Sequence, residues 1–186
     1  GGESGAGGGE KSGGKDVFQA SETMLFYEGK RAAVLNSEET LAYNLAATDT
    51  DYAYGSVAAE KDGEEIVYNL KMKISQKKIK LTFENGMPVI TFRIRASANV
   101  IDTDAASSIL DVAKTQIADE TVLKAAEAKF REELSSVYGK AAISGCDVFG
   151  IKKKLYRFCF KEYADFKDSV LEAADVRYDI RFTSLK

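Results

Sequence analysis

The chain has 186 residues, with 26 lysines and arginines, 29 aspartates and glutamates, and a formal net charge of -3. This length allows one domain with a proper hydrophobic core, and the small net charge disfavours binding to nucleic acid or to a strongly anionic surface. Histidine is absent, which excludes Ser-His-Asp triads, Cys-His pairs and imidazole metal sites. No apolar run reaches the roughly 20 residues of a membrane-spanning helix, so we expect the chain itself to be soluble.

The beginning of the chain is rich in glycine, with serine, glutamate and lysine at most of the other positions. Such a segment loses too much backbone entropy to become ordered and buries nothing. We therefore predict a flexible linker over residues 1–16 and a single α+β domain over residues 17–186. A phosphate-binding loop is disfavoured because no strand precedes the glycines and no helix follows them.

The next segment is predicted to form a hairpin and then a helix. Apolar runs on both sides of Gly29 indicate two short strands, with this glycine at a positive φ in the turn. Asn36 followed by Glu39 is a capping-box pattern, which predicts the start of a helix of about three turns.

Alternating apolar and polar residues then predict longer strands. Asp62-Gly63 and Asn85-Gly86 mark tight turns between them. Strict alternation returns at residues 175–182 and predicts a last strand that pairs with this sheet. We expect the period-two stretches from both ends of the chain to join in one layer, which has one apolar face and needs a cover.

The helices that cover the apolar face of this sheet are predicted in the second half of the chain. Apolar residues at intervals of three and four indicate a long amphipathic helix that starts at Asp119 and ends at Gly145. On its solvent side we expect Glu127 to pair with Arg131. Gly139 near the end predicts either that the helix stops early or that a neighbour packs closely there.

Shorter helices should follow. Asp147 is the predicted cap of the first one, and helical spacing continues through residues 160–174. The fold class predicted from these elements is α+β, a largely antiparallel β-sheet covered by a long amphipathic helix and shorter helices.

Candidate catalytic and metal-binding residues are few. Three pairs of carboxylates fall in a turn, at a strand end and on the polar side of a helix, where little burial is expected to raise a pKa: Glu64-Glu65, Asp102-Asp104 and Glu132-Glu133. The stretch "DTDAAS" from Asp102 resembles the start of a calcium loop but lacks its glycine and its final glutamate. We therefore expect no catalytic site, metal or cofactor.

Two further features have alternative interpretations. The lysines at 152–154 either contact anionic lipid headgroups or form a solvated helix face, and the second interpretation is favoured. Cys146 and Cys159 lack metal or redox spacing, so two semi-buried thiols are favoured, and a disulfide between them stays open.

Two groups of residues, one before and one after the long predicted helix, carry a resemblance to a known family. The first is an apolar strand, a lysine-bearing turn and an acidic helix start, and the second is a Gly-x-Asp-apolar-Phe-Gly element after the long helix. Their residues are Leu25, Phe26, Gly29, Lys30, Glu38, Glu39 and Thr40, then Gly145, Asp147, Val148, Phe149 and Gly150. From Thr23 to Lys186 the chain resembles the C-terminal domain of the Ger(x)C spore-germination proteins, the lipoprotein C subunits of nutrient germinant receptors.

This resemblance implies a non-catalytic accessory domain without a cofactor. The intact protein would lie at the outer face of the spore inner membrane, held by a lipid anchor outside this chain, beside the integral membrane subunits of the receptor. The present chain would then be an excised C-terminal domain, and a short natural lipoprotein trimmed of its lipid-bearing end is the less favoured alternative. Gly145, Asp147, Phe149 and Gly150 are expected to form a structural motif, with Asp147 as a helix cap and Gly150 as a close-packing point.

Two alternatives remain for the function. The first is a domain that binds a small nutrient molecule in a deep apolar cavity with a few inward polar groups. The second, less favoured, is an enzyme that uses carboxylates alone.

Overall fold

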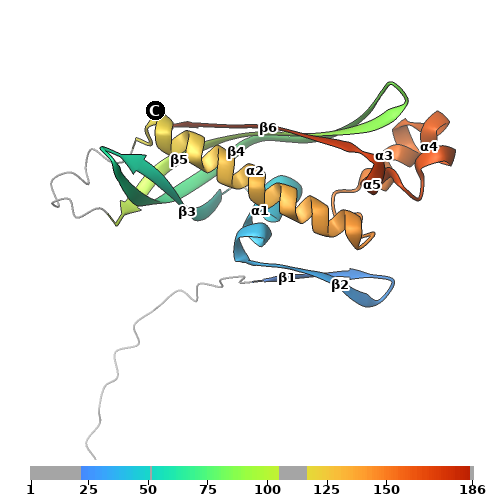
Figure 1. Cartoon of the computed structure of the whole chain (residues 1–186), viewed down its shortest axis with the longest axis horizontal. Coiled ribbons are helices and arrows are strands. Elements are labelled where there is room, and N and C mark those ends of the chain that lie inside the picture. Colours follow the sequence, from blue (N-terminus) through green and yellow to red (C-terminus); the bar gives the residue numbers. More distant parts are fainter. Residues whose placement is uncertain (1–21, 51, 105–116, 185–186) are drawn as a thin grey trace, which may run out of the picture.

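A computed structural model describes residues 22–50, 52–104 and 117–184, so the predicted linker at residues 1–16 lies outside the described part. The described residues form an α+β fold, as predicted, with a four-stranded sheet, a two-stranded sheet and five helices (Figure 1). The elements in chain order are β1 (Thr23–Tyr27), β2 (Lys30–Leu35), α1 (Ser37–Ala47), β3 (Tyr52–Lys61), β4 (Glu64–Glu84), β5 (Met87–Thr103), α2 (Glu120–Ile143), α3 (Ile151–Phe158), α4 (Phe160–Phe166), α5 (Val170–Ala173) and β6 (Asp175–Ser184).

The large sheet has the strand order β3-β4-β5-β6, and its first three strands are joined by antiparallel hairpins. Both predicted turns are confirmed. Asp62 and Gly63 have φ angles of 55° and 85°, and Asn85 and Gly86 have φ angles of 51° and 79°. Positive φ at two successive positions is the geometry that Asp-Gly and Asn-Gly favour in two-residue hairpins. Local turn chemistry therefore sets the register of the two longest strands.

The first hairpin forms a sheet of its own, made of β1 and β2. Its turn contains Gly29 with the predicted positive φ, here 76°. The expectation that all period-two stretches join in one layer is wrong for this hairpin. Its buried residues Leu25 and Leu35 belong to the common core, and β2 contacts α1 and α2. The hairpin therefore buries its apolar side against the helices.

The last strand joins the large sheet, as predicted. β6 runs parallel to β5, with Phe92 opposite Tyr178, and the connection between the two strands contains helices α2 to α5. A parallel pair needs such a crossover because a tight turn can join only antiparallel strands. The other two strand pairs of this sheet are antiparallel, so the sheet is largely antiparallel, as predicted.

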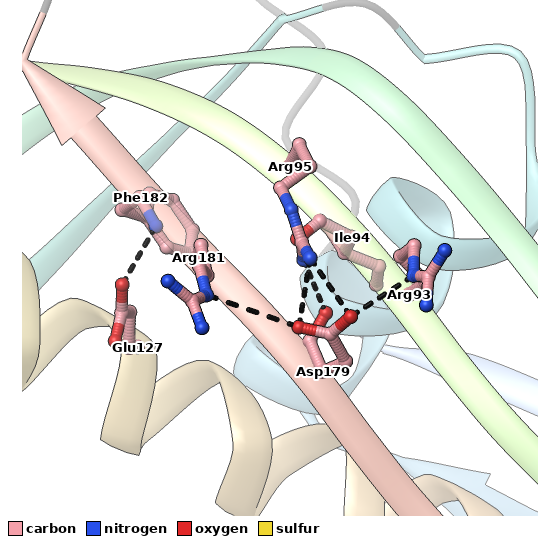
Figure 2. A network of polar contacts seen from close by, with 7 residues as sticks. All are labelled: Arg93, Ile94, Arg95, Glu127, Asp179, Arg181 and Phe182. Carbon is pink, nitrogen blue, oxygen red and sulfur yellow. Dashed lines mark hydrogen bonds and ion pairs between the residues drawn. The ribbon is translucent and has the colours of Figure 1, made fainter.

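Polar contacts on the outer face join β6 to β5 (Figure 2). Arg95 donates from Nη2 to both carboxylate oxygens of Asp179 at 2.8 Å, and Arg93 donates from Nε to the same carboxylate at 2.9 Å. Arg95 also donates from Nη1 to the backbone carbonyl of Asp179 at 2.7 Å. The Arg95 guanidinium, together with Arg93, lowers the pKa of Asp179 despite the opposing effect of desolvation.

Helix α2 lies along the sheet (Figure 1) and covers its apolar face. Leu134 and Val137 are fully buried there. The predicted ion pair between Glu127 and Arg131 is not among the salt bridges of the described residues. Glu127 instead accepts a hydrogen bond from the backbone N–H of Phe182 at 2.8 Å (Figure 2). β6 is an edge strand, so its outward N–H groups need a partner other than a strand.

An aromatic cluster lies at the centre of the core around Phe92, which is fully buried. Its ring centroid lies 4.9 Å from that of Phe149, 5.5 Å from Tyr178 and 6.1 Å from Tyr138. These three partners come from the α2–α3 connection, from β6 and from α2. One strand residue therefore contacts three separate segments of the second half of the chain.

The helices after α2 differ from the prediction in their boundaries. The predicted run over 160–174 is divided, because α4 ends at Phe166 and a new helical turn starts from the carbonyl of Ser169. This carbonyl accepts from the N–H groups of Glu172 at 3.0 Å and Ala173 at 2.8 Å. The hydroxyl of Tyr138 on α2 donates to the carbonyl of Leu171 at 2.7 Å and fixes the short helix α5.

Gly139 fits neither of the two predicted alternatives. Helix α2 continues past it to Ile143, and a Cβ built at this position meets no atom within 4 Å. The end of the helix is set later, by Ser144 as the C-cap and by Gly145 with φ 71°, as predicted for Gly145. Gly139 therefore weakens the helix without a packing reason in the described structure.

Replacement of Gly139 by alanine should stabilise the protein by about 0.5–1 kcal/mol, because alanine loses less backbone entropy in a helix interior. Urea unfolding followed by circular dichroism measures the change. Gly145→Ala is the matched control and should destabilise, because its positive φ disfavours any side chain. A Gly139→Ala variant that is less stable than the parent would contradict the assignment of this position to an open helix surface.

Candidate functional site

The candidate site is a cavity of about 670 Å³ between α1, β3, β4 and α2. Its wall is largely apolar, and its larger apolar side chains include Leu41, Val57, Leu70, Met72 and Phe130. A concave, mostly apolar space with a few polar groups is typical of small-molecule sites. The sequence did not predict its position, because its lining comes from four separate elements.

Gly55 in β3 keeps the backbone close to the floor of the cavity. A Cβ at this position would lie 3.1 Å from Cε of Met72 and 3.2 Å from Cδ2 of Leu41. A glycine inside a strand often marks such a close approach. Gly55 was not singled out in the sequence, although a glycine within a predicted strand could have indicated this close approach.

Three charged side chains lie at the cavity: Glu38 on α1, and Lys129 and Glu133 on α2. The ammonium group of Lys129 pairs with the carboxylate of Glu38, and it also donates to the backbone carbonyl of Ser56 at 3.1 Å. The carboxyl group of Glu133 lies close enough to Glu38 for the negative charge of Glu38 to raise its pKa. The site therefore contains two acidic groups and one basic group near one another.

The protonation of Glu133 differs from the expectation for the Glu132-Glu133 pair. Burial raises the pKa of Glu133, and the negative charge of Glu38 raises it further. The sequence placed this pair on a polar helix side, where little burial was expected. That prediction is wrong for Glu133, which is partly buried against α1, and it holds for Glu132, which is exposed.

Glu39 lies next to the cavity lining, outside it, and joins α1 to α2. It is buried, and its carboxylate closes the predicted capping box by accepting from the N–H of Asn36 at 2.8 Å. It also accepts from the hydroxyl of Ser136 and from the ammonium group of Lys140, both at 2.6 Å. Lys140 in turn donates to the carbonyl of Val34 at 3.0 Å. One carboxylate thus joins the end of β2, the start of α1 and the face of α2.

The pKa of Glu39 results from opposing effects. Burial alone would raise it, but the hydrogen bonds from Lys140, Ser136 and Asn36 outweigh burial and lower the pKa. Glu39 therefore stays ionised in the folded protein, while Glu133 on the facing helix is easier to protonate.

The predicted structural motif forms the connection between α2 and α3. The carboxylate of Asp147 accepts from the N–H groups of Ile151 at 2.6 Å and Lys152 at 2.8 Å. It does so from outside the N-cap position, which Gly150 occupies with φ 67°. The interpretation of Gly150 as a close-packing point is wrong, since a Cβ there meets no atom within 4 Å. Its positive φ is what favours glycine.

The other two motif residues also have structural surroundings. Gly145 terminates α2, and Phe149 is buried edge-on to Phe92 and to Tyr43 of α1, with ring centroids 4.9 and 5.9 Å away. None of the four motif residues, Gly145, Asp147, Phe149 and Gly150, lines the cavity.

The remaining candidate carboxylates are engaged or exposed. Asp104 accepts from the N–H of Val67, and Asp102 from the N–H of Thr103, both at 2.8 Å. Glu64 and Glu65 are exposed beside a turn. Within the described ranges no group of three or more acidic or cysteine side chains is arranged to hold a metal ion. The calcium-like stretch continues into residues 105–107, which are outside those ranges.

Both cysteines are free thiols, Cys146 buried and Cys159 partly buried. This agrees with the favoured interpretation of two semi-buried thiols. Burial raises the pKa of the Cys159 thiol, which disfavours the reactive thiolate. No helix in the described part of the chain has the length and apolar character needed to cross a bilayer.

Comparison with known families identifies this architecture. Residues 21–183 match the family described as "Spore germination B3/ GerAC like, C-terminal". The chain belongs to this family of spore-germination domains. The match starts just before β1 and ends in β6, so it includes every helix and all but the last residue of the strands described above. It confirms the predicted resemblance.

The solved crystal structure of the GerBC protein has a similar fold, with a TM-score of 0.59 and 18% sequence identity. The alignment covers 85% of this chain and 48% of that protein, so the GerAC-like chain spans about half the length of GerBC. No curated protein matches the chain.

The buried Glu39 carboxylate should stabilise the domain. Glu39→Gln should lower the free energy of unfolding at neutral pH by about 1–3 kcal/mol, because a buried neutral amide loses the charge-assisted bond from Lys140. The folded pKa of Glu39 is lowered, so its contribution is present above the unfolded pKa and disappears as the pH falls through the folded value. Urea unfolding at neutral and acidic pH should show this loss, with the exposed Glu132→Gln variant as the unaffected control.

Glu133 should behave in the opposite way. Glu133→Gln should stabilise at neutral pH by about a few tenths of a kcal/mol, because it removes a repulsive contact between two carboxylates. A raised folded pKa makes the parent protein lose stability as the pH rises through that value, so the gain should disappear below about pH 4. The same unfolding series and the same Glu132→Gln control test this. Equal effects of the two substitutions would contradict the placement of Glu133 against Glu38.

Proposed function

We propose that the chain is the C-terminal interaction module of the C subunit of a spore nutrient germinant receptor. The observation that carries this proposal is the family match over residues 21–183, which spans nearly the whole described fold. In this proposal the intact protein is a lipoprotein at the outer face of the spore inner membrane. A lipid anchor outside the chain holds it there, residues 1–16 are a flexible linker, and residues 17–186 form one domain that contacts the integral membrane subunits.

The proposed module acts without catalysis and without nucleic acid. The carboxyl pair most similar to a catalytic one is Glu38 with Glu133 at the cavity. Glycosidases use one carboxyl group as an acid and leave the other free to act as a base or nucleophile. The carboxylate of Glu38 is instead held in an ion pair with Lys129, which supports an accessory role over glycoside hydrolysis.

The test is deletion of the coding region for residues 23–184, with everything upstream left intact, in the organism that makes this protein. Nutrient-triggered germination should be lost or strongly slowed, because the receptor lacks one of its contact surfaces. The amounts of the other receptor subunits in spore membranes are measured in parallel. Normal germination with normal receptor assembly would refute the proposed module.

The cavity supports a second proposal, that the domain binds a small nutrient molecule. Its apolar wall suits an aliphatic side chain, while Glu133 and Lys129 offer opposite charges to a zwitterion. An amino acid with an apolar side chain combines these features: its ammonium group would contact Glu133 and its carboxylate would contact Lys129. The opposite charges of Glu133 and Lys129, together with the apolar wall, are the observation that favours this function.

Thermal unfolding with apolar amino acids tests the second proposal. Ligand at about 100 times its dissociation constant adds about 2.7 kcal/mol to the stability of a one-site protein, a clear shift of the midpoint. The double variant Glu133→Gln and Lys129→Met should remove the shift, and the control pair Glu132→Gln and Lys124→Met on the same helix should keep it. An absent shift, or an equal shift in both double variants, would refute binding in the cavity.

A further inference from the structure

An aromatic surface is formed by α3 and the start of α4. Tyr156, Phe158 and Phe160 are 60%, 74% and 76% exposed, although they lie within five residues of each other. Helix α3 turns Ile151 and Leu155 into the core, where both are fully buried. Helix α3 therefore contributes Ile151 and Leu155 to the core, and the three exposed rings lie outside the core.

The same segment is strongly basic. Between residues 151 and 161 the chain has five basic side chains and no acidic one, although the net charge of the whole chain is -3. Asp147 lies just before this segment, but its carboxylate is used by two backbone N–H groups of α3. The first acidic residue after it is Glu162. We call the exposed rings and their basic neighbours the tip patch, which consists of Lys152, Lys153, Lys154, Tyr156, Arg157, Phe158, Phe160 and Lys161.

The tip patch lies at one end of the long axis of the molecule, together with the turns of the β1–β2 and β4–β5 hairpins (Figure 1). Nζ of Lys152 lies 5.9 Å from the ring centroid of Tyr27 in the first hairpin. At the other hairpin, Phe166 of α4 contacts Phe83 with ring centroids 5.4 Å apart. These contacts place α3 and α4, which carry the tip patch, against both hairpins.

The basic groups and the aromatic rings are intermixed in the tip patch. The guanidinium carbon of Arg157 lies 5.5 Å from the ring centroid of Phe158, and Tyr156 meets Tyr163 of α4 edge to face at 5.4 Å. Lys153 and Arg157 are exposed beside the rings. An extended apolar surface on a folded protein marks an interaction site, and the surrounding positive charge selects an anionic partner.

We propose that the tip patch docks directly on a bilayer surface that contains anionic phospholipids. Phe158 and Phe160 enter the headgroup region, and the lysine and arginine side chains extend to the phosphates. A second copy of the chain is a poor partner for the same surface, because two basic patches repel each other.

This contact goes beyond the proposed receptor module, because it gives the domain its own contact with the membrane in addition to a lipid anchor. It also changes the interpretation of the lysines at 152–154. The sequence alone favours a solvated helix face over lipid headgroups.

A single tryptophan tests insertion, because the parent chain has no tryptophan. Phe158→Trp places the reporter in the tip patch, and Tyr54→Trp places it on β3, where Tyr54 is 62% exposed, as a control. On vesicles of phosphatidylcholine and phosphatidylglycerol, the fluorescence of the first variant should shift to shorter wavelength and become protected from an aqueous quencher. The control should show neither change. An unchanged spectrum for Phe158→Trp on vesicles would overturn the proposal.

Vesicle flotation of the full 186-residue chain tests the contribution of charge and of the rings. Lys153→Glu with Arg157→Glu should weaken binding about tenfold or more, since each basic group near an anionic surface contributes several-fold to affinity. Phe158→Ser with Phe160→Ser should have an effect of similar size. The matched controls are Lys71→Glu with Lys73→Glu and Tyr54→Ser, all at exposed positions on β3 and β4, and they should bind like the parent.

Three results would overturn the proposal. Equal binding to neutral and anionic vesicles would show that charge does not select the surface. Loss of binding in the Lys71 and Lys73 control, with binding intact in the tip variants, would place the contact on the sheet. Recruitment only to bilayers that contain the receptor membrane subunits would identify a protein partner. Circular dichroism and thermal unfolding should show that every variant is folded, as expected for exposed positions.

Discussion

The packing of Phe92 against three aromatic rings is the interaction on which the rest of the structure depends. Phe92 lies in β5, and its partners come from α2, from the α2–α3 connection and from β6. A sheet with one apolar face needs a cover, and this cluster fixes that cover in position. The cavity lies beside this cover, between α1, β3, β4 and α2. The same cluster anchors the connection from which α3 extends toward the end of the molecule.

The sequence predicted the features that depend on neighbouring residues. The Asn36–Glu39 capping box, the Asn85-Gly86 turn and the end of α2 at Gly145 are local, and each is confirmed. The fold class followed from them, because a period-two sheet and an amphipathic helix have few ways to bury their apolar faces together. The predicted pairing of Glu127 with Arg131 failed because Glu127 finds a distant partner. Glu127 binds the backbone of Phe182, which is 55 residues away, instead of its helical neighbour.

The candidate site was beyond prediction for the same physical reason. Glu133 and Glu38 are far apart in the chain, and their pKa relationship exists only because α1 packs against α2. The net charge also did not predict how the charged groups are distributed over the surface. A total of -3 indicated no attraction to anionic partners, but five of the basic groups are concentrated beside exposed rings at one end. In α3, Ile151 and Leu155 are buried while Phe158 is exposed, and the sequence did not predict this division.

The parallel pairing of β6 with β5 has a consequence for biosynthesis. The last strand is made after every other element, and β5 keeps an open edge until it arrives. The apolar stripe of α2 also lacks Phe182 as a partner until then. Such long-range pairing is slow, because the loop between the two strands must close before their contacts form. Without Asp175–Ser184, β5 would present an unpaired strand edge to which chaperones that bind extended apolar segments could attach.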